Sequence, residues 1–226
     1  MGTDIHLYVE KNTADGWEEV LAPYERSYGG RSWSPYHETG KWDDPRPDPT
    51  NRHYNVFGFL ADVRNGRGFA GVYTGEPTPP QFPDRGIPKD TSMKKVGETE
   101  DDEGYLPIGD HSFTHATLKE LLDAPWDMEV YSGGLVSVNE FLNRDEHGVP
   151  PSWCGGVGGG DTQIIDSPEK FQKMIDAGED LTGKYCRVGW KWKPLENSDF
   201  RRWCVEVLKP LVEDPEDIRV LIGFDS

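Results

Sequence analysis

The sequence predicts an α+β fold in a single domain, residues 1–226, with a largely antiparallel sheet, several short helices and long loops. Residues 4–11 and 184–193 alternate apolar and polar side chains, which is typical of strands that bury one face. Other segments carry apolar residues at helical spacing behind capping residues. Strands and helices do not follow a repeating βαβ order, and this favours an antiparallel sheet.

Strand signals recur along the chain. The first run, DIHLYVEK, is followed by a glycine-containing turn and the run WEEVL, so we expect a β-hairpin. Its apolar side carries Ile5 and Leu7, while its other side carries Asp4 and His6 and faces either water or a site. The expected strands are 4–11, 17–21, 127–137, 184–193 and 218–226.

Signals for the start and the end of helices also recur along the chain. Thr117 and Glu120 form a capping box, and Pro125 ends the helix that follows. Asn65 and Gly66 are expected to end the helix before it. The expected helices are 54–64, 117–124, 137–144, 167–178 and 198–214.

The connecting segments are rich in glycine and proline, with 26 Gly and 18 Pro in the chain. Two long loops, at about 23–53 and 66–104, show no hydrophobic period. Loops of this length inside a compact domain are usually functional or mobile. They are therefore where a binding site is expected.

Composition excludes several classes of protein. No run approaches the 18 or so apolar residues that a membrane span needs, so we expect no membrane. The opening lacks a basic segment followed by an apolar core, which argues against secretion. Three cysteines without a C-x-x-C pair fit a reducing, cytoplasmic compartment.

The charge distribution points to a small ligand. A net charge of −17 argues against general nucleic-acid binding, which needs Lys and Arg to neutralise phosphates. Residues 46–95 nevertheless hold eight Lys or Arg against five Asp or Glu. This basic stretch is a candidate binder of a small anion, the alternative being ordinary scatter of surface charge.

One group of candidate residues combines carboxylates with imidazoles. Asp4 and His6 on the first strand, with Asp110 and His111 before the second helix, are ligand types for a divalent metal such as zinc. His111 and Asp110 are also candidate catalytic acid–base groups. The alternative is that His6 fills a polar niche and that the residues near 110 form a turn or cap.

A second group consists of fixed donors near the basic stretch. Arginine suits phosphate or carboxylate, and Gly66 and Gly68 let backbone N–H groups approach a ligand. The alternative is pairing with nearby carboxylates. The candidate ligand-binding residues are Arg52, Asn55, Arg64, Asn65, Arg67, Arg85 and Ser112.

Weaker motifs have simpler explanations. A single H-x-T at 115–117 overlaps the helix cap, and the glycine-rich run at 154–162 lacks the strand and the Lys-Ser or Lys-Thr of a phosphate loop. Trp153, Trp190, Trp192 and Trp203 are expected to pack in the core or an interface, the alternative being a stack for a base.

Four stretches, MGTDIHLYVE, RHYNVFGFLADVRNGRGFAGV, PDRGIP and GDHSFTHATLKELL, together resemble a protein family of actinobacterial phages and their hosts that carries no established activity. The resemblance covers roughly residues 1–125 with long gaps. It implies a cytosolic accessory protein of an infected or lysogenic bacterium. The polar positions within the matching stretches are Asp4, His6, Arg52, Asn55, Asp62, Arg64, Asn65, Arg85, Asp110, His111 and Ser112.

Three functions remain open from the sequence. The first is binding of a small phosphorylated, nucleotide-like ligand, as in sequestration of a host signal. The second is a metal-dependent hydrolase or phosphodiesterase. The third is an acidic inhibitor of a host protein, and the partners considered besides a small ligand are such a host protein or a second copy of the chain.

Overall fold

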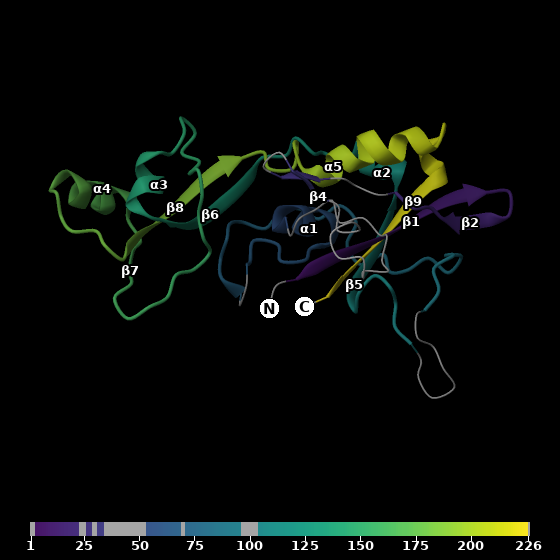
Figure 1. Ribbon diagram of the computed structural model, residues 1–226, viewed down its shortest axis with the longest axis horizontal. Helices are drawn as coiled ribbons and strands as arrows, with labels where there is room; N and C mark the ends of the chain where they lie inside the picture. The colour runs from purple at the N-terminus through teal and green to yellow at the C-terminus, as the bar shows by residue number, and fades with distance from the viewer. Residues whose placement is uncertain are drawn as a thin grey trace.

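Two larger sheets and the helices packed on them organise the chain (Figure 1). The computed structural model describes residues 3–22, 26–28, 31–33, 53–68, 71–95 and 104–225. The strands are β1 (Asp4–Thr13), β2 (Gly16–Glu19), β3 (Arg26–Tyr28), β4 (Arg31–Trp33), β5 (His111–Thr117), β6 (Val130–Val136), β7 (Gln163–Ile165), β8 (Lys184–Trp192) and β9 (Ile218–Asp225). The α-helices are α1 (Tyr54–Ala61), α2 (Leu118–Asp123), α3 (Val138–Leu142), α4 (Pro168–Asp176) and α5 (Asp199–Trp203).

The first sheet joins the two ends of the described chain. Its strand order is β2-β1-β9-β5, and each neighbouring pair is antiparallel. Ile5 pairs with Phe224, and Leu7 pairs with Ile222, so the apolar sides of β1 and β9 face the same way. β9 is buried from Ile218 to Phe224, because it lies inside the sheet and both of its faces are covered.

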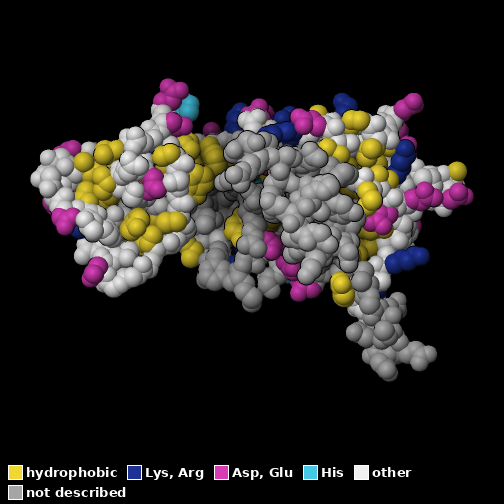
Figure 2. Space-filling view, in the orientation of Figure 1, with side chains coloured by type: hydrophobic (Ala, Val, Ile, Leu, Met, Phe, Trp, Pro, Cys, Tyr) yellow, Lys and Arg dark blue, Asp and Glu magenta, His cyan; other side chains and the backbone are white. Residues whose placement is uncertain are grey.

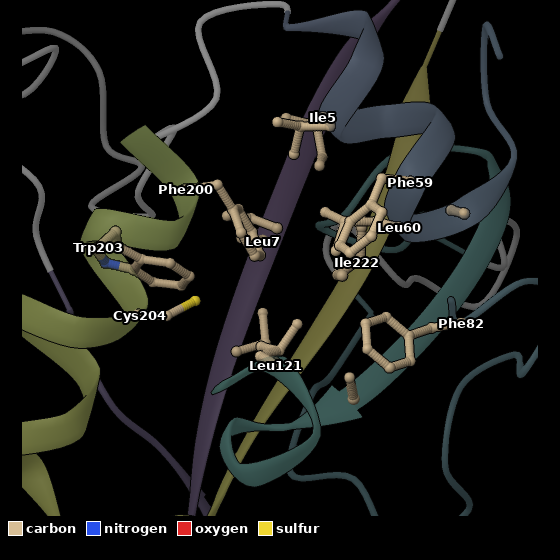
Figure 3. Close-up of a cluster of buried hydrophobic side chains, with 14 of the residues drawn as sticks. Ile5, Leu7, Phe59, Leu60, Phe82, Leu121, Phe200, Trp203, Cys204 and Ile222 are labelled. Carbon is tan, nitrogen blue, oxygen red and sulfur yellow. The ribbon is translucent and has the colours of Figure 1, made fainter. Parts of the chain in front are cut away.

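The main hydrophobic core lies on one face of this sheet. Side chains of α1, α2 and α5 meet Ile5, Leu7 and Ile222 there, as Figure 3 shows. Aromatic rings fill much of the space: Phe59 lies 4.6 Å from Trp126, centroid to centroid. Such rings bury large apolar areas, which compensates for the low apolar content of the chain.

The opposite face of the sheet is covered by irregular chain. Tyr8 and Leu221 pack against Met93 and Ile108, which come from the segments 85–95 and 104–110. Gly223 permits this contact, because a Cβ at that position would lie 2.0 Å from the carbonyl oxygen of Ile108. These loops therefore belong to the packed structure.

The second sheet has the strand order β6-β8-β7 and carries α3 and α4. β6 pairs with β8 in antiparallel fashion, and β7 pairs with β8 in parallel. Phe141, Phe171 and Trp190 are buried in a separate cluster on one of its faces. In Figure 2, apolar side chains also gather on the surface of this part of the molecule.

The sequence predicted the fold class correctly: the chain is α+β with largely antiparallel sheets. The N-terminal hairpin and the strands formed by 184–192 and 218–225 are confirmed. The capping box expected at Thr117 with Glu120 is present, and Ser137 forms a second one with Glu140.

Several boundaries were wrong. α1 ends at Ala61, because Asp62 adopts a left-handed conformation with φ 63° and donates its backbone N–H to Gly58. Residues 111–117, which were not predicted as a strand, form β5, because they pair with β9. The α-helix expected over 198–214 is regular only in α5. It continues as a π-helical turn at Cys204–Leu208 and ends as a 3₁₀ turn at Lys209–Leu211. Pro210 explains the irregular end, since it has no N–H to donate.

The expected loop at 23–53 lies largely outside the described residues. Within it, β3 and β4 pair as a short antiparallel hairpin, which corrects the expectation of a wholly irregular segment. The described parts of 66–104 are irregular, with isolated bridges between Arg67 and Tyr73 and between Gly75 and Ser132. Across the described ranges no helix combines the length and the apolar character that a membrane span requires.

Candidate functional site

One end of the first sheet brings together three segments that lie far apart in the sequence. β1 begins there, β9 ends there and β5 begins there, so that Asp4 pairs with Asp225 and His111 pairs with Phe224. The start of β1 and the end of β9 lie side by side in Figure 1. The turn after α1 reaches the same place through a hydrogen bond from Arg64 to Thr3. We call this region the sheet-end site.

His6 is oriented by a carboxylate on the neighbouring strand. Its Nε2 lies 3.0 Å from Oδ2 of Asp225, while Oδ1 of Asp225 accepts the backbone N–H of Asp4 at 3.3 Å. The side chains of His6 and Asp225 are 34% and 48% exposed, so solvent or a ligand can reach them. An exposed pair of this kind adds little stability but holds the imidazole in one orientation. Asp225 was not predicted, because only the strand register reveals it.

His111 occupies the other face of the sheet. Its ring stacks on Phe224, with centroids 6.1 Å apart, and Phe224 belongs to the core face on which α1 packs. His6 pairs with Gly223 on the opposite face. The Nδ1 of His111 also lies 2.9 Å from the hydroxyl oxygen of Ser112.

Left-handed backbone conformations mark this region. Ser112 has φ 52° and Arg64 has φ 53°, and Asp62 has φ 63°. Residues other than glycine rarely adopt this conformation, which costs on the order of 1 kcal/mol and is enriched at functional sites. Three of the four such residues within the described ranges are positions that the sequence singled out, the fourth being Asp84.

Two hydrogen bonds hold the guanidinium of Arg64 in place. Its Nε donates to the hydroxyl of Thr3 at 2.8 Å, and its Nη1 donates to the carbonyl oxygen of Gly68 at 3.2 Å. Thr3 is buried, so the clamp is anchored in the packed structure. A guanidinium has five N–H donors, and the remaining three have no partner among the described residues.

The metal site expected from Asp4, His6, Asp110 and His111 does not form. No group of three or more His, Cys, Asp or Glu in the described ranges lies close enough together to hold a metal ion. The register explains this result, because His6 and His111 lie on opposite faces of the sheet. Asp110 is exposed and donates its backbone N–H to Phe224.

Two of the expected ligand residues are occupied by internal contacts. The amide of Asn65 accepts the backbone N–H of Thr78 at 2.7 Å and donates to the carbonyl oxygen of Thr78 at 2.6 Å. Arg85 donates to the carboxylate of Glu120 at 2.9 Å. These residues hold loops against helices, so they do not contribute to the sheet-end site.

The other expected ligand residues differ in position. Asn55 lies half-buried in α1, and Arg67 is exposed with its backbone paired to Tyr73. Arg52 lies outside the described residues. Only Arg64 and Ser112 of this set are therefore placed at the sheet-end site.

The weaker motifs have structural roles. Thr117 caps α2, as expected, and His115 contacts the carbonyl oxygen of Gly86 through Nδ1 at 2.9 Å. Cys154, Cys186 and Cys204 are all free thiols. Burial raises the pKa of the Cys186 thiol to about 11, so this thiol stays protonated near neutral pH.

One polar network was not foreseen from the sequence. Glu10, on the same side of β1 as Asp4 and His6, is fully buried and binds Arg219. Separately, His53 at the N-cap position of α1 has a buried Nδ1 without a hydrogen-bond partner in the described part of the chain. Burial lowers the pKa of His53, so that its ring stays neutral near neutral pH.

Comparison with known proteins gives no relative: no family model, no curated protein and no solved structure matches the chain.

Proposed function

We propose that the sheet-end site binds a small phosphorylated, nucleotide-like anion. The observation that carries this proposal is the clamped guanidinium of Arg64, which keeps unused donors beside the start of β1. Arginine remains charged at any physiological pH, and its planar fork matches a phosphate. A left-handed backbone at Arg64 is a cost that anion binding would offset.

Two imidazoles lie at the same end of the sheet, His6 on one face and His111 on the other. His6 is oriented by Asp225, and His111 is held against Phe224 and Ser112. An imidazole can donate a hydrogen bond in its neutral as well as its charged form. Each histidine is therefore suited to contact a ligand oxygen on its own face of the sheet.

The size of the site favours a molecule over a single ion. Two strand spacings and two residues along β1 separate the backbones of His111 and Thr3, which amounts to roughly 12 Å. A nucleotide spans a distance of this order, with its phosphate at Arg64 and its remainder toward His111. The acidic surface elsewhere would repel nucleic acid while one local site still accepts a small anion.

The cellular role that fits these features is sequestration of a phosphorylated host signal in the cytoplasm of an infected or lysogenic bacterium. The resemblance to a phage and prophage family supports that setting, and the three free thiols are compatible with a reducing compartment.

A thermal-shift panel tests the proposal. Nucleoside monophosphates, cyclic dinucleotides and inorganic phosphate are added to the full chain at millimolar concentration, and at least one phosphorylated compound is expected to raise the Tm. Arg64→Ala should abolish that increase, whereas Lys170→Ala, an exposed site on α4, should preserve it. Arg64→Lys keeps the charge and serves as the folding control. If no phosphorylated compound shifts the wild-type Tm, the proposal is wrong.

A second candidate function is hydrolysis of a phosphate ester, favoured by the pairing of His6 with Asp225. A carboxylate that orients an imidazole is the usual arrangement of a general base. Turnover of a nitrophenyl phosphate diester, measured with and without chelator, would support this function if Asp225→Asn lowers kcat. Turnover that is equal in wild type and Asp225→Asn would exclude a role for the pair.

A further inference from the structure

The second sheet has two paired glycines on the face opposite its hydrophobic cluster. Gly133 of β6 pairs directly with Gly189 of β8, so two adjacent strands lack side chains at the same level. Residues directly opposite in an antiparallel pair share one face, and here that face also carries Tyr131 and Arg187. The backbone of both strands is therefore free of its own side chains at this level.

Two tyrosine side chains lie over these glycines. The Tyr131 ring lies across β8, since a Cβ at Gly189 would be 2.0 Å from its hydroxyl oxygen. Tyr73 lies over Gly133, where a Cβ would be 3.5 Å from its ring. The Tyr73 segment is fixed to the edge of β6, because Gly133 donates its N–H to Thr74 at 2.9 Å.

Both rings remain accessible despite these contacts. Tyr73 is 45% exposed and Tyr131 is 39% exposed. The hydroxyl of Tyr73 donates to Glu76 at 2.7 Å, which orients the ring and raises the pKa of Tyr73 to about 12. The Tyr73 hydroxyl therefore stays protonated at neutral pH.

A cavity of about 270 Å³ opens between these groups, with Asp166 and Arg187 in its wall. The volume is near the lower end of ligand pockets, about 300–1,000 Å³, and suits one planar ring system. The Nε of Arg187 donates to Oδ1 of Asp166 at 3.0 Å. Among the described residues, both Nη groups of Arg187 and the Oδ2 of Asp166 have no other partner.

Packing of aromatic rings on glycines would explain the positions of the two tyrosines. It does not explain the cavity or the Arg187–Asp166 pair in its wall. A planar ligand would satisfy both. Tyrosine faces stack on a base at a gain of about 1–3 kcal/mol. The side chains of Arg187 and Asp166 are 40% and 75% exposed, so both can reach a ligand. Together they place a donor beside an acceptor, which matches a ring that has an acceptor beside a donor on its edge.

We propose that this cavity binds a 6-oxopurine base, the ring of guanine. The base stacks on the two tyrosine rings that cover Gly133 and Gly189. Arg187 donates to O6, and Asp166 accepts from N1–H and the 2-amino group. The cavity shares no residue with the sheet-end site and needs no phosphate, so its occupancy is independent of that site.

Calorimetric titration of the full chain with guanosine tests the inference. Guanosine is expected to bind, and adenosine is expected to bind at least about tenfold more weakly, because its 6-amino group and bare N1 oppose Arg187 and Asp166. Since neither nucleoside carries a phosphate, the result does not depend on Arg64. Absence of guanosine binding, or equal binding of both nucleosides, would overturn the proposal.

Three variants locate the binding. Asp166→Asn should weaken guanosine at least about tenfold, while Lys191→Gln, on the same face of β8 but paired with Glu129, should leave binding unchanged. Gly133→Ala adds a methyl group that meets only ordinary contacts, so the chain should fold. Because Gly133 lines the cavity, the methyl group takes up space there and should weaken guanosine binding. Wild-type affinity in both Asp166→Asn and Gly133→Ala would show that the nucleoside binds elsewhere.

Discussion

Arg219 and Glu10 form a buried ion pair between β9 and β1, two neighbouring strands of the first sheet that lie at opposite ends of the sequence. The Nε and Nη2 of Arg219 donate to Oε2 of Glu10 at 2.9 Å and 2.7 Å. The other oxygen of Glu10 accepts from the hydroxyl of Thr91 and from Ser92. The carboxylate therefore fastens the segment 85–95 onto the face of the sheet opposite the main core.

Removal of the cation from this pair should be strongly destabilising. Arg219→Met leaves Glu10 buried without its counter-ion, so we expect the free energy of unfolding to fall by about 3–5 kcal/mol. The matched change Arg202→Met removes an exposed arginine paired to Asp199 at 3.5 Å and should cost under about 1 kcal/mol. Urea unfolding curves measure both values.

A double variant separates charge from packing. Glu10→Gln combined with Arg219→Met should regain part of the lost stability, because no charge is then buried alone. Equal midpoints for Arg219→Met and Arg202→Met would contradict the role of the pair.

Asn65 should stabilise the chain by joining the end of α1 to the loop around Thr78 through hydrogen bonds. Its amide binds both backbone groups of Thr78, so Asn65→Ala leaves a buried N–H and a carbonyl group unsatisfied. We expect a loss of about 2–3 kcal/mol in the free energy of unfolding. Asn143→Ala, at an exposed amide directly after α3, should change it by less than about 1 kcal/mol. If Asn65→Ala unfolds at the wild-type urea concentration, these hydrogen bonds are dispensable.

The sequence predicted those elements whose signals are local. The alternation of 4–11 and the capping pair Thr117–Glu120 each lie within a few residues, and both formed as expected. β5 was missed because its pairing with β9 depends on residues about a hundred positions away. Local pattern carries no information on such a partner.

The candidate site shows the same division. Residue type singled out Arg64 and Ser112, which lie at the sheet end, and equally Asn65 and Arg85, which are used by Thr78 and Glu120. The partner of His6 is Asp225, 219 residues further along the chain. A side chain suited to a ligand is equally suited to the interior of its own protein, and only the tertiary structure distinguishes the two.

Gly223 should not tolerate a side chain. Gly223→Ala would place a Cβ 2.0 Å from the carbonyl oxygen of Ile108, so either β9 or the segment 104–110 must move. We expect a loss of about 1–3 kcal/mol, as for other overpacked positions. Gly156→Ala, where nothing lies within 4 Å, is the matched control and should leave the Tm near the wild-type value. Equal Tm values for the two variants would mean that the Ile108 segment does not pack as described.

His53 should make the chain less stable in acid. Burial lowers the pKa of His53 in the folded state, and the nearby Asp199 opposes this effect only in part. Below the unfolded pKa of about 6.5, His53 binds a proton in the unfolded chain but stays unprotonated in the folded chain. Stability is therefore present at neutral pH and is lost as the pH falls.

Unfolding in urea between pH 7.5 and 5.0 measures this loss. His53→Gln should reduce the dependence of the free energy of unfolding on pH by up to one proton, at most about 1.4 kcal/mol per pH unit. His147→Gln, whose side chain is 73% exposed, should keep the wild-type slope. A slope for His53→Gln equal to that of His147→Gln would show that His53 gains its proton equally well in the folded chain.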